Sequence, residues 1–197
     1  MDMPANDKPD APARNHGSTL ASTGPRDDLL GLMELLFFAY RDFIAEPDAM
    51  LAELGFGRAH HRVLHFIGRH PGLRVSELLA ILRITKQSLG RVLRELVERG
   101  YVMQQAGATD RRQRLLRLTR KGEALLRRLE APQMERVRLA LEQAGPEARR
   151  AFAHTLLALV DDGERATVAR LCGLPELLNT PPGEDDAGSR PAHSHRR

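Results

Sequence analysis

The sequence predicts a mainly α fold that contains one small β-hairpin. Apolar residues recur at helical spacing through most of residues 27–173. Two strand-length segments on either side of a polar loop, 101–105 and 114–118, are the one exception. The flanking segments 1–26 and 174–197 are rich in Pro, Gly, Ser and Asp and have no apolar periodicity, so we expect them to be disordered tails.

The composition is typical of a soluble globular protein and excludes several other classes. Of the 197 residues, 42% are hydrophobic and 28% are charged. The single cysteine, Cys172, excludes an internal disulfide and any multi-cysteine metal module within one chain. The first apolar run, 35–40, is far shorter than the roughly 20 residues that span a membrane, and residues 1–8 lack a secretory signal. We therefore expect no membrane association and a cytoplasmic location.

The first predicted helix, in the region 27–46, is apolar over most of its surface. Twelve of the seventeen positions from Asp28 to Ile44 carry apolar side chains. A helix of this kind has to be buried on more than one side. A partner subunit can supply the second covering surface, and the alternative is a central core helix within a monomer.

Three shorter helices are predicted in the centre of the chain. They span residues 58–69, 75–82 and 85–99, with Thr85 as an N-cap and Gly100 as a C-terminal stop. A short turn around Arg83 joins the second helix to the third. Because the third helix is polar and basic on one face, this spacing predicts a helix-turn-helix that places its second helix in the DNA major groove.

The predicted hairpin follows the helix-turn-helix directly. Its strands flank a polar, basic loop at 106–113, whose tip carries Arg111 and Arg112. A hairpin in this position is a wing, and arginines at its tip suit the narrow, strongly negative minor groove. Residues 57–119 are therefore predicted to form a winged helix-turn-helix.

Long helices are predicted between residues 120 and 172. Thr119 caps the first of them, in which Pro132 predicts a kink. After the break at Gly145-Pro146, an apolar stripe from Phe152 to Leu171 predicts one further helix. Together with the helix at 27–46, this segment forms the predicted helical dimerisation region.

Positive charge is concentrated in the middle of the chain. Residues 58–128 hold 17 Lys and Arg against 5 Asp and Glu, whereas the remainder holds 13 against 21, and the whole chain has a formal charge of +4. This distribution is typical of a surface that displaces counterions from a phosphate backbone. A merely solvated basic face is the alternative.

These features resemble the MarR family of winged-helix transcription regulators over about residues 28–171. The sharpest match is the segment 110–119, DRRQRLLRLT, which follows the family's wing pattern of Asp-x-Arg, five residues and Leu-Thr. Segment 75–79 resembles the first helix of the family's helix-turn-helix, and segment 85–102 resembles its recognition helix and the residues that follow it. The resemblance implies a homodimer that holds two winged lobes over a near-palindromic operator. The sequence departs from the family at 103–105, where Met-Gln-Gln stands in place of the usual Arg.

Candidate DNA-reading residues lie early on the third central helix. Gln87, Ser88 and Arg91 are expected to read bases, because Gln can bond adenine and Arg can bond guanine bidentately. Thr85, Lys86 and Arg94 are better placed for phosphates. The alternative for Ser88 is a plain helix-surface hydroxyl.

On the wing, the resemblance implies that Asp110 braces an arginine and that Arg112 enters the minor groove. Arg111 and Arg114 lie nearby. A carboxylate that fixes a guanidinium before DNA arrives reduces the entropy lost on binding. The alternative for Asp110 is a salt bridge that only orders the hairpin.

The resemblance also implies a small, often aromatic anionic effector in a cleft beside the dimerisation helices. Candidate pocket residues are Tyr40, Phe43, Arg58, His60, His61 and His65. The i, i+4 spacing of His61 and His65 also suits two metal ligands, but two histidines are too few for a complete site. A metal-responsive regulator and plain helix packing are thus the alternatives, and no cofactor is predicted.

The predicted function is a sequence-specific regulator of double-stranded DNA, acting as a repressor that a small molecule releases. A DNA-binding architectural protein indifferent to sequence is the alternative. An enzyme is not predicted, since phosphate-loop, zinc-protease and serine-hydrolase motifs are missing. Asp161, Asp162 and Glu164 are expected to face solvent or a partner arginine, and Cys172 is expected to be structural or incidental.

Overall fold

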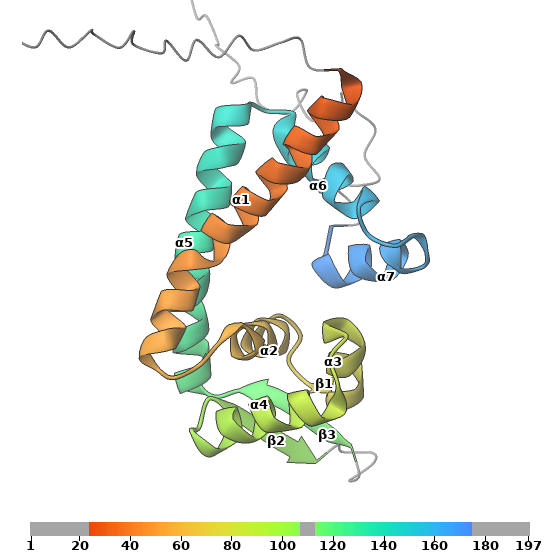
Figure 1. The fold of residues 1–197 in the computed structure, drawn as a ribbon. Coiled ribbons are helices and arrows are strands. Elements are labelled where there is room, and N and C mark those ends of the chain that lie inside the picture. The colour runs from red at the N-terminus through yellow and green to blue at the C-terminus, as the bar shows by residue number, and fades with distance from the viewer. Residues whose placement is uncertain (1–23, 107–112, 175–197) are drawn as a thin grey trace, which may run out of the picture. The chain divides into compact units, whose positions relative to one another are not determined.

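The computed structural model describes residues 24–106 and 113–174 (Figure 1). Within these ranges the chain forms seven helices and one three-stranded antiparallel sheet, which confirms the predicted mainly α class. The described residues divide into two compact units between Phe43 and Ile44, inside the first helix. No helix in the described ranges has the length and apolar character needed to cross a membrane.

Helix α1, Pro25–Glu53, is longer at both ends than the predicted span of 27–46. It continues through Pro47, although proline removes one helical hydrogen bond. Pro47 is buried together with Ile44 and Leu51. Burial of these apolar side chains in the second unit therefore outweighs the local signal that a proline ends a helix.

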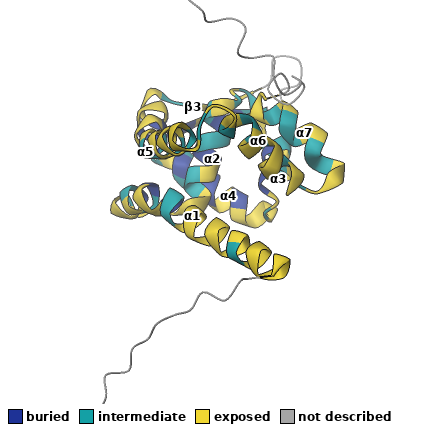
Figure 2. Ribbon diagram, turned by 90° about the horizontal axis from the view of Figure 1, so that it is seen from above, coloured by how far each residue is buried: buried dark blue, intermediate teal, exposed yellow. Residues whose placement is uncertain are grey.

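The part of α1 in the first unit carries a long series of exposed apolar side chains. The ribbon of its N-terminal turns is mostly in the colour of exposed residues (Figure 2). The exposed fraction exceeds 60% for four of these side chains, Leu29, Leu32, Leu35 and Phe37. Leu30, Met33, Leu36, Phe38 and Tyr40 are also exposed. The alternative of a helix buried in the core of a monomer is therefore wrong for this segment.

The second unit contains the winged lobe, whose elements follow the predicted order. Helices α2 (Arg58–Arg69), α3 (Val75–Leu82) and α4 (Lys86–Glu98) are followed by strands β2 (Val102–Ala106) and β3 (Arg114–Leu118). The lobe also contains a strand that the sequence did not predict, the two-residue β1 (Leu73–Arg74). It pairs with β3, so that Leu73 lies opposite Leu116, and gives the sheet order β1-β3-β2.

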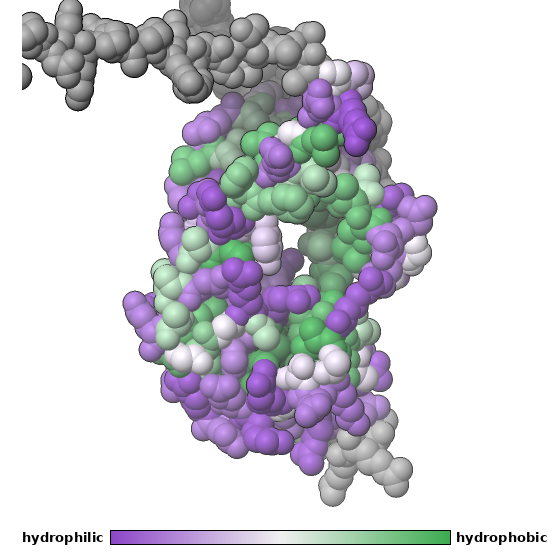
Figure 3. All heavy atoms as spheres, viewed as in Figure 1, coloured by the Kyte–Doolittle hydropathy of each residue, from purple (hydrophilic) through white to green (hydrophobic). Residues whose placement is uncertain are grey.

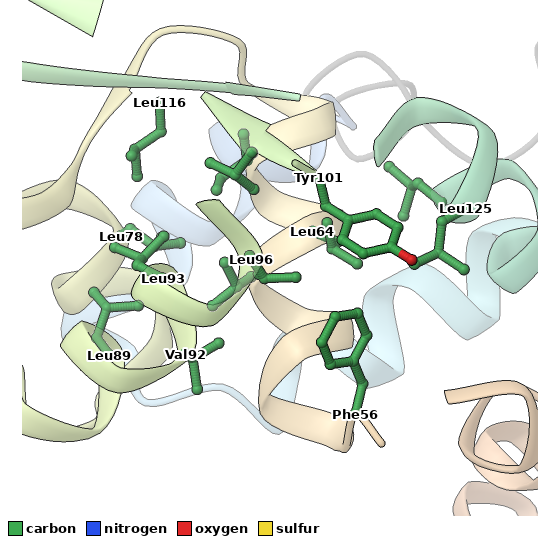
Figure 4. Close-up of a cluster of buried hydrophobic side chains, with 14 of the residues drawn as sticks. Phe56, Leu64, Leu78, Leu89, Val92, Leu93, Leu96, Tyr101, Leu116 and Leu125 are labelled. Atoms are coloured by element: carbon green, nitrogen blue, oxygen red, sulfur yellow. The ribbon is translucent and has the colours of Figure 1, made fainter. Parts of the chain in front are cut away.

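The core of the lobe lies between its three helices and the sheet (Figure 4). Leu64 of α2, Leu78 of α3, Leu96 of α4 and Leu116 of β3 are fully buried there. Each comes from the buried face of its element, so one contiguous core fixes all four elements. This core holds α4 in place while leaving its opposite face free of the lobe.

Helix α5 (Arg120–Ala144) begins as predicted, because Thr119 Oγ1 accepts a hydrogen bond from the Gly122 amide at 3.1 Å. It runs through Pro132 as one element. The predicted single helix after Gly145-Pro146 is wrong, since the chain forms α6 (Ala148–Ala158) and α7 (Asp162–Cys172).

The break between α6 and α7 has a local cause. Asp161 adopts a non-helical backbone conformation, with φ −51° and ψ 134°. The side chain of Arg165 donates hydrogen bonds to the carbonyl oxygens of Val160 and Ala158, at 3.0 and 2.6 Å. These bonds satisfy carbonyl groups that a continuous helix would have paired within its backbone. The predicted tails lie outside the described residues, apart from 24–26 and 174 at their inner ends.

Candidate nucleic-acid interface

Helix α4 has one buried face and one exposed face. Leu89, Val92, Leu93 and Leu96 point into the core. The opposite side lines an open surface cavity of about 850 Å³, which is formed by Lys86, Gln87, Ser88, Gly90, Arg91 and Arg94. The structure thus brings five of the six predicted reading residues onto one surface, which we call the α4 surface. Its three cationic and two neutral polar side chains suit a phosphate backbone and the base edges beside it.

The sixth predicted residue, Thr85, is the N-cap of α4. Its Oγ1 accepts a hydrogen bond from the Ser88 amide at 3.1 Å and lies 2.9 Å from Ser88 Oγ. The cap satisfies one of the free amides of the first helical turn. Thr85 therefore sets the position at which the α4 surface begins, and its hydroxyl is already engaged with Ser88.

The wing is described only in its strands. Ala106 lies opposite Arg114 at the distal end of the hairpin, and the Arg114 side chain is exposed. Asp110, Arg111 and Arg112 lie outside the described residues, so their roles stay predictions. Hydrophilic side chains gather at the end of the molecule where Figure 1 places α4 and the hairpin (Figure 3).

The C-terminal half of α4 is tied to α2 through His60. The His60 ring stacks on Phe56, with 4.5 Å between ring centroids. Its Nδ1 accepts the Gly57 amide hydrogen at 3.1 Å, and its Nε2 lies 3.0 Å from Glu95 Oε2. This pairing requires the tautomer in which Nε2 carries the proton. His60, predicted as a pocket residue, thus links α2 to α4, and its partner Glu95 gave no signal in the sequence.

Arg99 fixes the end of α4 in the same region. Its guanidinium lies over the Phe56 ring, 4.1 Å from the centroid, and donates a hydrogen bond to the Leu54 carbonyl oxygen at 2.7 Å. A cation on an aromatic face and a hydrogen bond restrain the side chain together. Both ends of the α4 surface are consequently held by specific contacts.

The remaining predicted pocket residues fall in both units. Tyr40 is exposed and Phe43 is half-buried, and both belong to the first unit. In the second unit, Arg58 Nε donates to Asp48 Oδ2 at 2.7 Å, and His65 Nδ1 lies 2.8 Å from Glu130 Oε1 of α5. The effector pocket stays a prediction. Among the described residues, no three His, Cys, Asp or Glu side chains are grouped so that they could hold a metal ion.

The half-buried His61 provides a test by pH. Burial lowers the pKa of His61, and the nearby His65 lowers it further, whereas Glu130 and Asp48 act in the opposite direction. Below the unfolded-state pKa, about 6.5, the unfolded chain binds the proton more readily than the folded chain. We expect stability to fall as the pH decreases through this range. Thermal melts between pH 5 and 8 should show a weaker decline for His61→Asn, and equal slopes for both proteins would contradict this expectation.

A helix-turn-helix with an exposed cationic helix, followed by an antiparallel hairpin, defines the class of winged-helix DNA-binding proteins. A sequence profile of the MarR family matches residues 54–113. The HTH-type transcriptional regulator PetP of Rhodobacter capsulatus is 48% identical over 133 residues, which cover 68% of this chain and 80% of PetP. The chain therefore belongs to the MarR family, whose members are DNA-binding transcriptional regulators and not enzymes.

Further similarities agree with this assignment. An HTH-type transcriptional repressor of Mycobacterium bovis is 34% identical over 86 residues, which cover 44% of this chain and 62% of the repressor. The crystal structure of MarR superposes with a TM-score of 0.53 and 26% identity, covering 76% of this chain and 98% of MarR. A second MarR family regulator of known structure gives a TM-score of 0.58 at 22% identity, covering 74% and 95% of the two chains.

Proposed function

We propose that the protein is a homodimeric, sequence-specific repressor that binds a near-palindromic operator in the cytoplasm and is released by a small anionic effector. The observation that carries the DNA-binding part is the α4 surface. It presents Gln87, Ser88 and Arg91 beside Lys86 and Arg94, on a helix held by a continuous core. Side chains that read bases need such a rigid support, because their hydrogen bonds depend on position.

Two observations support the finer parts of the proposal. The exposed apolar side chains of α1 form a surface that monomeric proteins rarely leave in water, and a second copy of the chain would cover it. Repression is supported by the relative from Mycobacterium bovis, which is described as a repressor. Two copies related by a twofold axis would read two equivalent half-sites, which is the reason to expect a near-palindromic operator.

The test is a binding titration with the full chain. A duplex from the region upstream of its own gene is compared with a shuffled duplex of the same composition, at two salt concentrations. We expect salt-sensitive binding with a preference of about a thousandfold for the upstream duplex. Equal binding to both would favour an architectural protein, and no binding to either would contradict DNA binding altogether.

Arg91 and Arg94 allow base reading and phosphate binding to be separated. Arg91→Ala should cost about 1–3 kcal/mol on the operator and much less on shuffled DNA, because a base contact distinguishes sequences. Arg94→Ala should weaken binding to both duplexes alike. It should also reduce by about one the slope of log affinity against log salt concentration. Each variant removes one exposed arginine from the same α4 surface and so controls for the other. If the two variants behave identically on the two duplexes, the division of roles is wrong.

A further inference from the structure

Arg83 occupies the turn of the helix-turn-helix, between α3 and α4. Its backbone is left-handed, with φ 50°, and its amide donates to the Leu79 carbonyl oxygen at 3.0 Å. Arg83 lies two residues before the cap Thr85, at the start of the α4 surface. In helix-turn-helix proteins the N-terminal residues of the second helix contact base edges while the first helix crosses the phosphate backbone. A long cationic side chain at this turn is thus within the region where phosphates are contacted.

Two carboxylates at the start of α7 hold this arginine. One terminal guanidinium nitrogen of Arg83 lies 3.3 Å from Asp161 Oδ2, and the other is paired with Glu164 Oε1. These partners are some 80 positions away along the chain, so the contact ties α7 to the turn. The hydrogen bond to Glu164 and then that to Asp161 raise the pKa of Arg83. Asp161 and Glu164 were expected to face solvent or an arginine, and Arg83 is the arginine that they contact.

Asp162 and Arg165 of α7 are engaged with each other and do not compete for Arg83, Asp161 or Glu164. Asp162 is paired with Arg165 at 2.8 Å, and Arg165 also binds the carbonyl oxygens that precede α7. The far end of α7 is near the lobe as well, because an Arg69 guanidinium nitrogen lies 3.5 Å from the Cys172 carbonyl oxygen. Helix α7 therefore contacts the lobe through Arg83 at its first turn and through Arg69 at its last, and we call this helix the strap.

The two carboxylates bring negative charge to the turn that leads into the α4 surface, whose own side chains are cationic or neutral. DNA phosphates and carboxylates compete for a guanidinium through the same charge-assisted hydrogen bonds. All three side chains of these two ion pairs are well exposed, with exposed fractions of 59% for Arg83, 78% for Asp161 and 44% for Glu164. Exposed ion pairs are weak and screened by salt, so a phosphate can replace the carboxylates.

We propose that Arg83 is a phosphate-contacting residue which Asp161 and Glu164 of α7 hold in the DNA-free protein, so that the strap competes with DNA. This inference rests on the proposed DNA-binding function and adds to it an intramolecular competitor. Binding of DNA exchanges the two carboxylates for a phosphate at Arg83. The acidic strap consequently lowers the affinity for every duplex, without changing which sequence is preferred.

The test uses the full chain and the upstream duplex. Asp161→Asn/Glu164→Gln should bind roughly three- to tenfold more tightly than the unmodified protein, the range expected when two exposed ion pairs are removed. Asp162→Asn is the matched control, because it removes one negative charge from the same helix but from Arg165 instead of Arg83. We expect this control to change the affinity by less than about twofold, since it leaves the Arg83 pair in place.

A double-mutant cycle separates competition for Arg83 from a general change in charge. Arg83→Gln alone should weaken binding and reduce the salt slope by about one. In the Arg83→Gln background, neutralising Asp161 and Glu164 should have no further effect. An equal gain in both backgrounds would overturn the proposal, and so would an unchanged salt slope for Arg83→Gln.

Amide hydrogen exchange measures the strap without DNA. In Arg83→Gln, amides of residues 162–172 should exchange faster than in the unmodified protein, whereas those of α2 should not change. Unchanged exchange in α7 would show that Arg83 does not hold the strap, which contradicts the inference whatever the DNA result. If the unmodified protein binds no DNA, the proposed function fails; binding with no coupling between Arg83 and the two acids overturns the strap alone.

Discussion

Replacing Leu32 and Leu35 with glutamate is expected to convert the protein to a monomer and to remove most of its operator affinity. Both leucines lie in the first unit with more than 60% of their side chains exposed, so the substitutions create no cavity within one chain. A dimer would bury four leucines at these positions. Exposing them again costs on the order of 6 kcal/mol or more, or about a ten-thousandfold weaker association.

The loss of DNA affinity follows from the loss of the second reading lobe. Two linked lobes bind two half-sites with an affinity that exceeds that of one lobe by roughly 10²- to 10⁴-fold. Sedimentation should give the mass of one 22.0 kDa chain for Leu32→Glu/Leu35→Glu, and twice that mass for the unmodified protein. The matched control is Leu32→Met/Leu35→Met, which keeps the surface apolar and should keep the dimer. A glutamate variant with unchanged mass would show that this surface of α1 does not hold two copies together.

Local signals in the sequence were sufficient to predict the three helices and the two longer strands of the winged lobe. The start of α4 was predicted from Thr85, because an N-cap is a property of one hydroxyl and the amides next to it. The end of that helix was predicted from Gly100, which has φ +72° and ends the helix without strain. The exposed face of α4 followed from the spacing of its leucines and valine, since residues at helical spacing share one side.

Most of the features that the sequence did not predict depend on contacts between distant residues. Strand β1 has only two residues and forms because β3, some forty residues later, pairs with it. The partner of His60 is Glu95, and the partners of Arg83 are Asp161 and Glu164. The spacing of residues within a helix says nothing of these pairs, because they are set by the packing of helices against one another. The break before α7 has a local cause instead, the bonds from Arg165 to two carbonyl oxygens, and it was missed because the apolar stripe continues across it.

The junction between the wing and α5 is expected to tolerate no side chain at Gly122. This residue is buried in the first turn of α5, where its amide donates to Thr119 Oγ1. A Cβ atom at Gly122 would lie 2.1 Å from the Tyr101 carbonyl oxygen and 3.0 Å from its carbon. That oxygen also accepts the Thr119 amide hydrogen at 3.0 Å, so the two backbone segments are held against each other.

Gly122→Ala should therefore lower the free energy of unfolding by about 3 kcal/mol, because the clash is with backbone and no side chain can rotate to relieve it. For a chain of this length the melting temperature should fall by roughly 6–12 °C. Gly90→Ala is the matched control, since Gly90 is an exposed helical glycine with no atom within 4 Å of the added Cβ. It should stabilise the protein by up to about 1 kcal/mol, because alanine favours a helix more than glycine does. We therefore expect the melting temperature to fall in Gly122→Ala and to rise in Gly90→Ala. Equal melting temperatures for the two variants would show that the junction is looser than the contact between Gly122 and Tyr101 implies.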